Sequence, residues 1–158
     1  MPFNKKTFIV LSSIILYILL FISGCAINQA RVNRPDLVNR NKKMFIYGHT
    51  DQASIYSTVK KKLNELGFEV VENKDEAGAT VDYNYECGWD VIHYTCRTFN
   101  LFVTDTMSNE IVFQSKFWAD SPLSASSLIS RMFDKLKKEL DQAMAQPVNP
   151  PDPRSSGR

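Results

Sequence analysis

The chain has few of the side chains from which catalytic and metal centres are usually built. Its 158 residues include two histidines and three cysteines, with no His-x-x-x-His or Cys-x-x-Cys pair that would predict a transition-metal site. The glycine-rich phosphate loop, the dinucleotide-binding glycine pattern and the Gly-x-Ser-x-Gly turn of hydrolases are also missing. We therefore expect no enzyme activity and no cofactor.

Two weaker arrangements of reactive side chains have simpler explanations. His93 and Cys96 would make a thiol dyad, but residues three apart point to opposite faces of a strand. Asp82 and Glu86 share one face of a predicted strand, where carboxylates keep that face in water. His49 follows the first predicted strand and marks a weaker candidate for ligand contact.

The chain also has no large excess of positive or negative charge. The net charge is +2, and the region from residue 43 to 144 holds 11 basic against 15 acidic residues. Proteins that bind nucleic acid carry a basic patch or stripe, and this mildly acidic region predicts none. We expect no nucleic acid among the partners of the protein.

What the chain does have is a secretory signal over residues 1–24. Lys5 and Lys6 precede a 15-residue apolar run from Phe8 to Ile22, and small residues follow. A helix that spans a membrane needs about 17–25 apolar residues, so the run is short for that role. A cleaved signal peptide is the favoured interpretation, and an uncleaved membrane anchor is the alternative.

The end of this signal, Ile22-Ser23-Gly24-Cys25, resembles the lipobox of bacterial lipoproteins. The resemblance implies cleavage before Cys25, a diacylglyceryl thioether on its sulfur and acylation of the new amino terminus with a fatty acid such as palmitate. The acyl chains would then hold the protein on the membrane. Because Ala26 rather than an aspartate follows, the resemblance also implies the periplasmic leaflet of the outer membrane; the inner membrane is the alternative.

The rest of the chain divides into three regions. Residues 25–42 comprise the lipidated cysteine and a segment without sustained periodicity, which predicts a flexible tether with its ends about 22 Å apart. Residues 43–144 predict a single α/β periplasmic domain. Residues 145–158 hold four of the seven prolines and predict a disordered tail.

The domain is predicted to open with a β-α-β unit. Residues 43–48 and 68–72 are short apolar strands, and Thr50 or Asp51 is placed to cap the helix between them. The apolar face of that helix consists of Ile55, Val59, Leu63 and Leu66. Gly67 supplies the positive φ that ends the helix.

Alternating apolar and polar residues predict a meander of three antiparallel strands over residues 79–90, 99–103 and 111–117. Asp120-Ser121-Pro122 is predicted to end the sheet, with Pro122 in the first turn of an amphipathic helix that reaches Met144. The fold class is therefore α+β, with a mostly antiparallel sheet of about five strands and two helices on one face.

Cys87 and Cys96 lie on consecutive predicted strands, and an oxidising periplasm favours a disulfide between them over two free thiols. A register that places Cys87 opposite Cys96 differs by one residue from the register that places Tyr85 opposite Phe99. Because a one-residue slip turns every side chain to the other face, both pairings require a β-bulge near residues 97–98.

Four aromatic residues lie along the same strands and are the candidate contact residues for a partner: Tyr83, Tyr85, Trp89 and Tyr94. Packing under the helices is one interpretation of this stripe. The other is a surface for a partner, because Tyr and Trp are enriched where proteins bind one another.

Residues 43–144 also resemble a group of small uncharacterised proteobacterial envelope lipoproteins. The resemblance rests on the order of the opening strand, Glu65-Leu66-Gly67-Phe68-Glu69-Val70, Trp89-Asp90-x-x-x-Tyr94 and the closing helix; Cys87, Cys96 and the Pro-rich tail depart from it. It implies no catalytic residues. We hypothesise a non-enzymatic, lipid-anchored periplasmic module for interaction with another envelope protein. The alternative is a binding module for a small ligand or peptidoglycan fragment, which a pocket lined by the aromatic stripe would favour.

Overall fold

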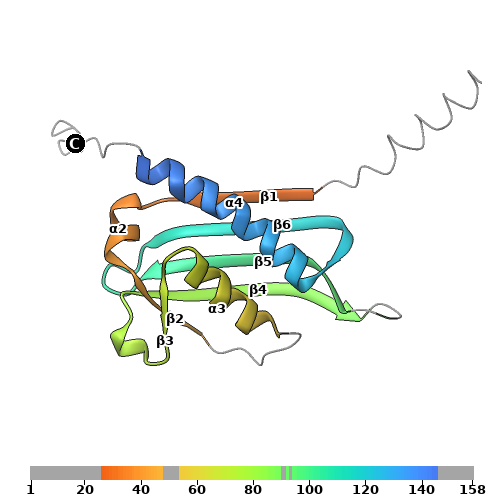
Figure 1. Cartoon of the computed structure of the whole chain (residues 1–158), viewed down its shortest axis with the longest axis horizontal. Coiled ribbons are helices and arrows are strands. Elements are labelled where there is room, and N and C mark those ends of the chain that lie inside the picture. Colours follow the sequence, from red (N-terminus) through yellow and green to blue (C-terminus); the bar gives the residue numbers. More distant parts are fainter. Residues whose placement is uncertain (1–25, 48–53, 90–91, 93, 146–158) are drawn as a thin grey trace, which may run out of the picture.

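A computed structural model describes residues 26–47, 54–89, 92 and 94–145. In this part of the chain, six strands form one mixed sheet in the order β1-β6-β5-β4-β2-β3. Helices α3 and α4 lie across one face of the sheet, and the other face is uncovered by helices (Figure 1). The α+β class is therefore confirmed, with one strand more than the expected five.

Strands and helices alternate only in the first half of the described chain, and three long strands follow before the last helix. The strands are β1 Ala26–Val32, β2 Lys43–Ile46, β3 Glu69–Val71, β4 Ala79–Trp89, β5 Tyr94–Asp105 and β6 Ile111–Ser124. The helices are α2 Pro35–Arg40, α3 Ile55–Glu65 and α4 Ala125–Ala145, with a short 3-10 helix η2 at Lys74–Glu76.

The predicted β-α-β unit is confirmed as β2, α3 and β3. Strand β2 pairs in parallel with both β3 and β4, so the unit joins the antiparallel part of the sheet through β4. Helix α3 follows Ser54 and buries Ile55, Val59 and Leu63; Thr50 and Asp51, the predicted caps, lie outside the described residues. Gly67 has a φ of 84°, the left-handed conformation predicted for the residue that ends the helix.

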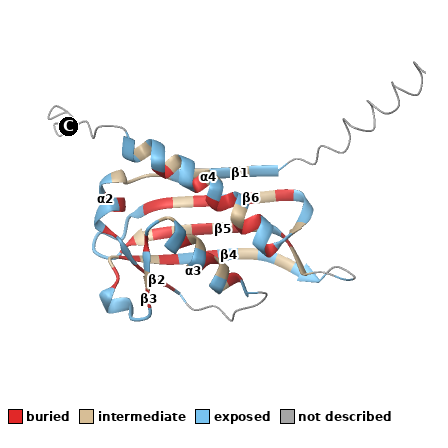
Figure 2. Cartoon of the chain, in the orientation of Figure 1, coloured by how far each residue is buried: buried red, intermediate tan, exposed pale blue. Residues whose placement is uncertain are grey.

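The core lies between the sheet and the two long helices. Figure 2 shows buried residues alternating with more exposed ones along β4, β5 and β6. The buried ones form one cluster with buried residues of α3 and α4. The largest contributors from the sheet are Phe99, Phe113 and Phe117, all at most 1% exposed. Helix α4 covers them with an apolar stripe made of Leu128, Ile129, Met132, Phe133, Leu136 and Leu140.

The prediction of a flexible tether before residue 43 is wrong over residues 26–42. Residues 26–32 form β1, which pairs antiparallel with β6 over seven residues, and α2 then buries Leu37 and Val38. The segment lacks an apolar period because Ile27 lies on the exposed side of β1, while the side toward α4 carries polar Asn28 beside Ala30 and Val32. Its partner strand lies more than 80 residues away in sequence, so no local pattern could indicate the pairing.

The predicted end of the sheet at Asp120-Ser121-Pro122 is also wrong. Strand β6 continues to Ser124, and α4 begins at Ala125, so Pro122 lies in a strand. The pairing with β5 shifts between Cys96↔Leu123 and Thr98↔Trp118. A proline is tolerated at such an irregularity because the ladder there does not need every backbone N–H.

Candidate functional site

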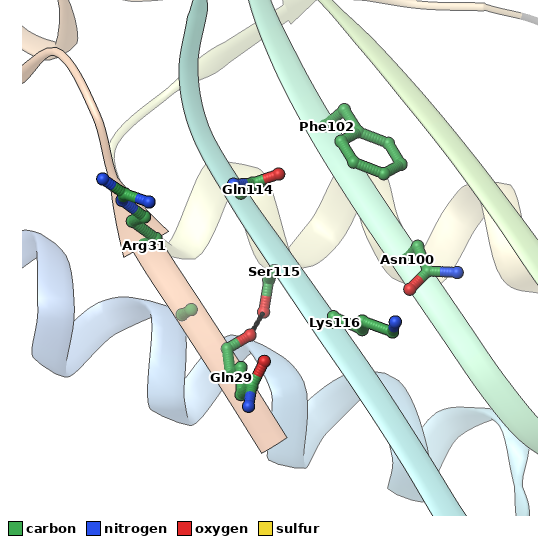
Figure 3. Close-up of a pocket in the computed structure, with 8 residues that line it drawn as sticks. Gln29, Arg31, Asn100, Phe102, Gln114, Ser115 and Lys116 are labelled. Atoms are coloured by element: carbon green, nitrogen blue, oxygen red, sulfur yellow. Dashed lines mark hydrogen bonds between the residues drawn. The ribbon is translucent and has the colours of Figure 1, made fainter. Parts of the chain in front are cut away.

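A candidate site is a pocket on the sheet face away from the helices. It spans β1, β5 and β6 and has a volume of about 650 Å³ (Figure 3). Its lining residues are Gln29, Ala30, Arg31, Asn100, Phe102, Gln114, Ser115 and Lys116. Strand periodicity explains Asn100, Phe102, Gln114 and Lys116, which alternate with buried neighbours such as Leu101 and so point to the open face. Ser115 and Ala30 instead stand in one row with the buried Leu101.

The pocket combines two cations, three amides and one aromatic ring. Arg31 and Lys116 attract a negative group, while the amides of Gln29, Asn100 and Gln114 offer both donors and acceptors. The hydroxyl of Ser115 donates to the carbonyl of Gln29 at 3.2 Å, so it is engaged within the protein. The described residues that line the pocket include no acid, histidine or cysteine. Its two cations favour an anionic ligand over a cationic one.

None of the four predicted contact residues lines this pocket. Sequence reasoning missed Phe102 and Arg31, for different reasons. Phe102 had a usable signal, because it alternates with Leu101 and Val103 and so falls on the opposite face of its strand. Arg31 had none, because its position on the pocket depends on the pairing of β1 with β6.

The β4–β5 hairpin confirms the predicted pairing of the cysteines. A disulfide joins Cys87 and Cys96, which face each other across the two strands. Tyr85 faces Phe99 in the register expected from the apolar pattern, and the register shifts by one residue between Glu86 and Cys87. Arg97 is the extra residue, so the β-bulge lies where the sequence predicts it.

The predicted aromatic stripe divides at this bulge. Tyr83 is 2% exposed and stacks on Phe99 with ring centroids 5.5 Å apart, so it belongs to the core. Tyr85 is half-buried and packs against the same core. Trp89 is 78% exposed, and the ring of half-buried Tyr94 meets its ring edge-on at 5.8 Å. Only the pair beyond the disulfide is placed to meet a partner.

A smaller hollow of about 410 Å³ lies beside this exposed pair. Its lining includes Trp89, the disulfide residue Cys87 and Pro122. Glu86 and Arg97 also line it and place one charge of each sign next to the tryptophan. The hollow therefore has no strong preference for a charged ligand.

The buried charge of the domain lies at the opposite end of the sheet and has a structural role. Asp105, 1% exposed, accepts hydrogen bonds from Arg40 at 2.8 Å, Asn41 at 2.7 Å and the backbone N–H of Ser108 at 2.7 Å. Burial alone raises the pKa of this carboxyl, but the hydrogen bonds outweigh it and hold the pKa well below its ordinary value. A Cβ at Gly78 would lie 2.8 Å from the Asn41 side-chain oxygen, so glycine permits this close approach.

Several predicted features lie outside the described residues. These are the signal peptide over residues 1–24, the lipidation site Cys25, the tail after Ala145, and His49 and His93. Within residues 26–47, 54–89, 92 and 94–145, no helix is long and apolar enough to cross a membrane. The same part of the chain contains no cluster of His, Cys, Asp or Glu side chains suited to a metal ion.

Comparison with known proteins places the fold but not an activity. No family model and no curated protein matches the chain. A DUF4136 family protein from Bacteroides thetaiotaomicron matches it with a TM-score of 0.50 at 8% identity, over 75% of this chain and 97% of that chain. PelC from Paraburkholderia phytofirmans, solved as a dodecamer, gives a TM-score of 0.47 at 17% identity, over 72% of this chain and 98% of that chain. The likeness to the DUF4136 family protein shows a shared fold alone.

Proposed function

We propose that the protein is a lipid-anchored periplasmic module that binds another envelope component and has no enzymatic activity. The observation that carries the proposal is the lipobox-like Ile22-Ser23-Gly24-Cys25, which ends a secretory signal immediately before the folded domain. The disulfide between Cys87 and Cys96 supports an oxidising compartment. The binding pocket without catalytic side chains supports a role in recognition.

The test of the anchor is the intact mass of the protein extracted from bacterial membranes. We expect loss of residues 1–24 and added diacylglyceryl and acyl mass on Cys25. The matched control is Cys25→Ser, which removes the sulfur that carries the lipid and should leave an unprocessed, unacylated chain. A full-length, unmodified wild-type chain in the membrane would contradict the proposal and support the uncleaved anchor.

Location in the outer membrane is tested by a change of the residue after the cysteine. Ala26 is exposed at the start of β1, opposite Ala119, so an aspartate is compatible with the strand. The lipoprotein resemblance implies that Ala26→Asp retains the protein in the inner membrane. Separation of the two membranes on a density gradient measures this. The matched control is Ala26→Ser, which should leave the distribution unchanged, and an aspartate variant found with the wild type would contradict the assignment.

The pocket on the open sheet face favours a second candidate function, the binding of a peptidoglycan fragment. Such a fragment carries carboxylates that match Arg31 and Lys116, and hydroxyls and amides that match Gln29, Asn100 and Gln114. Phe102 offers an apolar ring for the flat side of a sugar. Titration calorimetry with a purified muropeptide tests it. Arg31→Ala with Lys116→Ala should weaken binding at least tenfold, or about 1.4 kcal/mol.

The control for this titration is Lys138→Ala, an exposed cation on α4 and not among the residues that line the pocket. It should leave muropeptide binding unchanged. No heat of binding to the wild-type protein would reject the second function and leave the first standing.

A further inference from the structure

The folded domain begins directly at the proposed lipid site. Strand β1 starts at Ala26, the residue after Cys25. Consecutive Cα atoms are about 3.8 Å apart, so no spacer separates the sheet from an acylated Cys25. The lipid would therefore hold one particular end of the sheet at the bilayer surface. This step rests on the proposed function, because it requires the lipid on Cys25.

The same end of the sheet carries the tip of the β4–β5 hairpin, as Figure 1 shows for the start of β1 and the end of β4. Ile27, Trp118 and Thr98 stand side by side across β1, β6 and β5. On β5, Tyr94 lies four residues from Thr98 toward this end. Because the bulge takes up one of these residues, the distance along the strand is about 10 Å. Ala26 lies one residue toward it from Ile27, about 3.3 Å, and the covalent chain lets Cys25 extend by at most about 3.8 Å more. The hairpin tip therefore reaches at least as far as the lipid site.

Large apolar and aromatic side chains are exposed at this end. We define the tip surface as Trp89, Ile92 and Tyr94; Trp89 is 78% and Ile92 74% exposed, and Tyr94 is half-buried. Trp and Tyr are enriched at membrane–water interfaces because their rings are apolar at one end and polar at the other. The disulfide behind the tip holds the base of the hairpin, which lowers the entropy lost when the tip docks.

We propose that the tip surface rests on the same bilayer as the lipid, as a second membrane contact that sets the domain upright with its strands pointing into the membrane. A lipid surface fits better than a protein or a second copy of the chain. A lipid on the residue before Ala26 would hold this end of the sheet at the bilayer, so a protein on the tip surface would have to fit between the sheet end and the membrane. Glu86 and Arg97 beside Trp89 carry opposite charges, so the contact does not depend on anionic lipid.

Fluorescence quenching by brominated lipid tests the contact in the intact lipoprotein. Trp118→Phe leaves Trp89 as the remaining tryptophan, and Trp89→Phe leaves Trp118 as a control higher on the domain. Both variants are reconstituted in phosphatidylethanolamine–phosphatidylglycerol vesicles whose acyl chains are brominated near the headgroups. We expect Trp89 to lose about half of its fluorescence, since interfacial side chains lie about 5–10 Å into the headgroup–acyl boundary. Trp118 should lose clearly less.

The outcomes separate this proposal from the proposed function. The intact mass is measured first, and a chain without acyl mass on Cys25 overturns both. With the lipid present, equal quenching of Trp89 and Trp118 overturns the tip contact alone. Protection of Trp89 from aqueous acrylamide without quenching by brominated lipid also overturns it and indicates a second copy or another protein on the tip.

A second variant measures the strength of the contact. Trp89→Ser with Ile92→Ser should speed transfer of the lipoprotein from donor to acceptor vesicles about tenfold, because two large apolar side chains no longer leave water. Met107→Ser is the matched control, since Met107 is 85% exposed at the opposite end of the sheet. Its transfer rate should equal that of the wild type. Equal rates for the tip variant and the control would overturn the proposal.

Discussion

The two ends of the antiparallel sheet are stabilised by different interactions, hydrogen bonds to a buried carboxylate at one end and a disulfide at the other. At the end of β5, the carboxylate of Asp105 is buried and its hydrogen bonds join the β5–β6 turn to Arg40 and Asn41. At the start of β5, the Cys87–Cys96 disulfide closes the hairpin, and Trp89 beyond it stays in solvent. The first end satisfies its polar groups internally. The second leaves apolar surface that the fold does not require, and the proposed membrane contact lies there.

The largest stability effect is expected at the Asp105 end. Asp105→Ala removes the acceptor of Asn41, a side chain that is 2% exposed and would be left without its partner. We expect the free energy of unfolding to fall by about 3 kcal/mol, measured by urea denaturation. Asp105→Asn, which keeps the shape but not the charge, should lose less. A loss below about 1 kcal/mol for the alanine variant would show that water replaces the carboxylate.

The disulfide end should contribute somewhat less. The bridge spans a sequence separation of nine residues, and loop entropy gives it about 2–3 kcal/mol of stabilisation. Cys87→Ser with Cys96→Ser should lower the free energy of unfolding by that amount, and reductant should have the same effect on the wild type. The double variant provides the control, because reductant should not change its stability further.

Acid should weaken the Asp105 end selectively. Because the pKa of Asp105 is lower in the folded state, its carboxylate stabilises the fold above the unfolded pKa of about 3.9. That contribution is lost as the pH falls through and below this value. The difference in urea midpoint between wild type and Asp105→Asn should therefore narrow from about pH 6 to about pH 3. A constant difference would mean that the charge of Asp105 does not stabilise the fold.

The smallest effect is expected at the exposed tip. Trp89→Ser removes a side chain that is 78% exposed, so the free energy of unfolding should change by less than about 0.5 kcal/mol. Tyr83→Ser is the contrasting variant on the same strand, since Tyr83 is 2% exposed and stacks in the core. Similar losses for both variants would show that the tip is part of the core and would remove the contrast between the two ends.

The parts of the fold that sequence predicts correctly are those with a short-range physical signal. The face of α3 follows from apolar residues three and four apart, and its end follows from the positive φ that Gly67 allows. The bulge between β4 and β5 follows from two pairings that differ by one residue. The sequence could not show which residues of the aromatic stripe are buried. Strand alternation puts Tyr83 and Trp89 on the same face of β4, and the position of the helices decides which of the two is covered.

By itself, the sequence determined the α+β class, the β-α-β unit, the amphipathic helices and the disulfide with its bulge, because periodicities of two and 3.6 residues act over a few positions. Only the tertiary structure decided that residues 26–32 become an edge strand, that β6 runs on through Pro122, and that Arg31, Phe102 and Lys116 share a pocket. These features join segments far apart in the chain. Their stability comes from the partner strand, and a local pattern carries no information about a partner that is about 80 residues away.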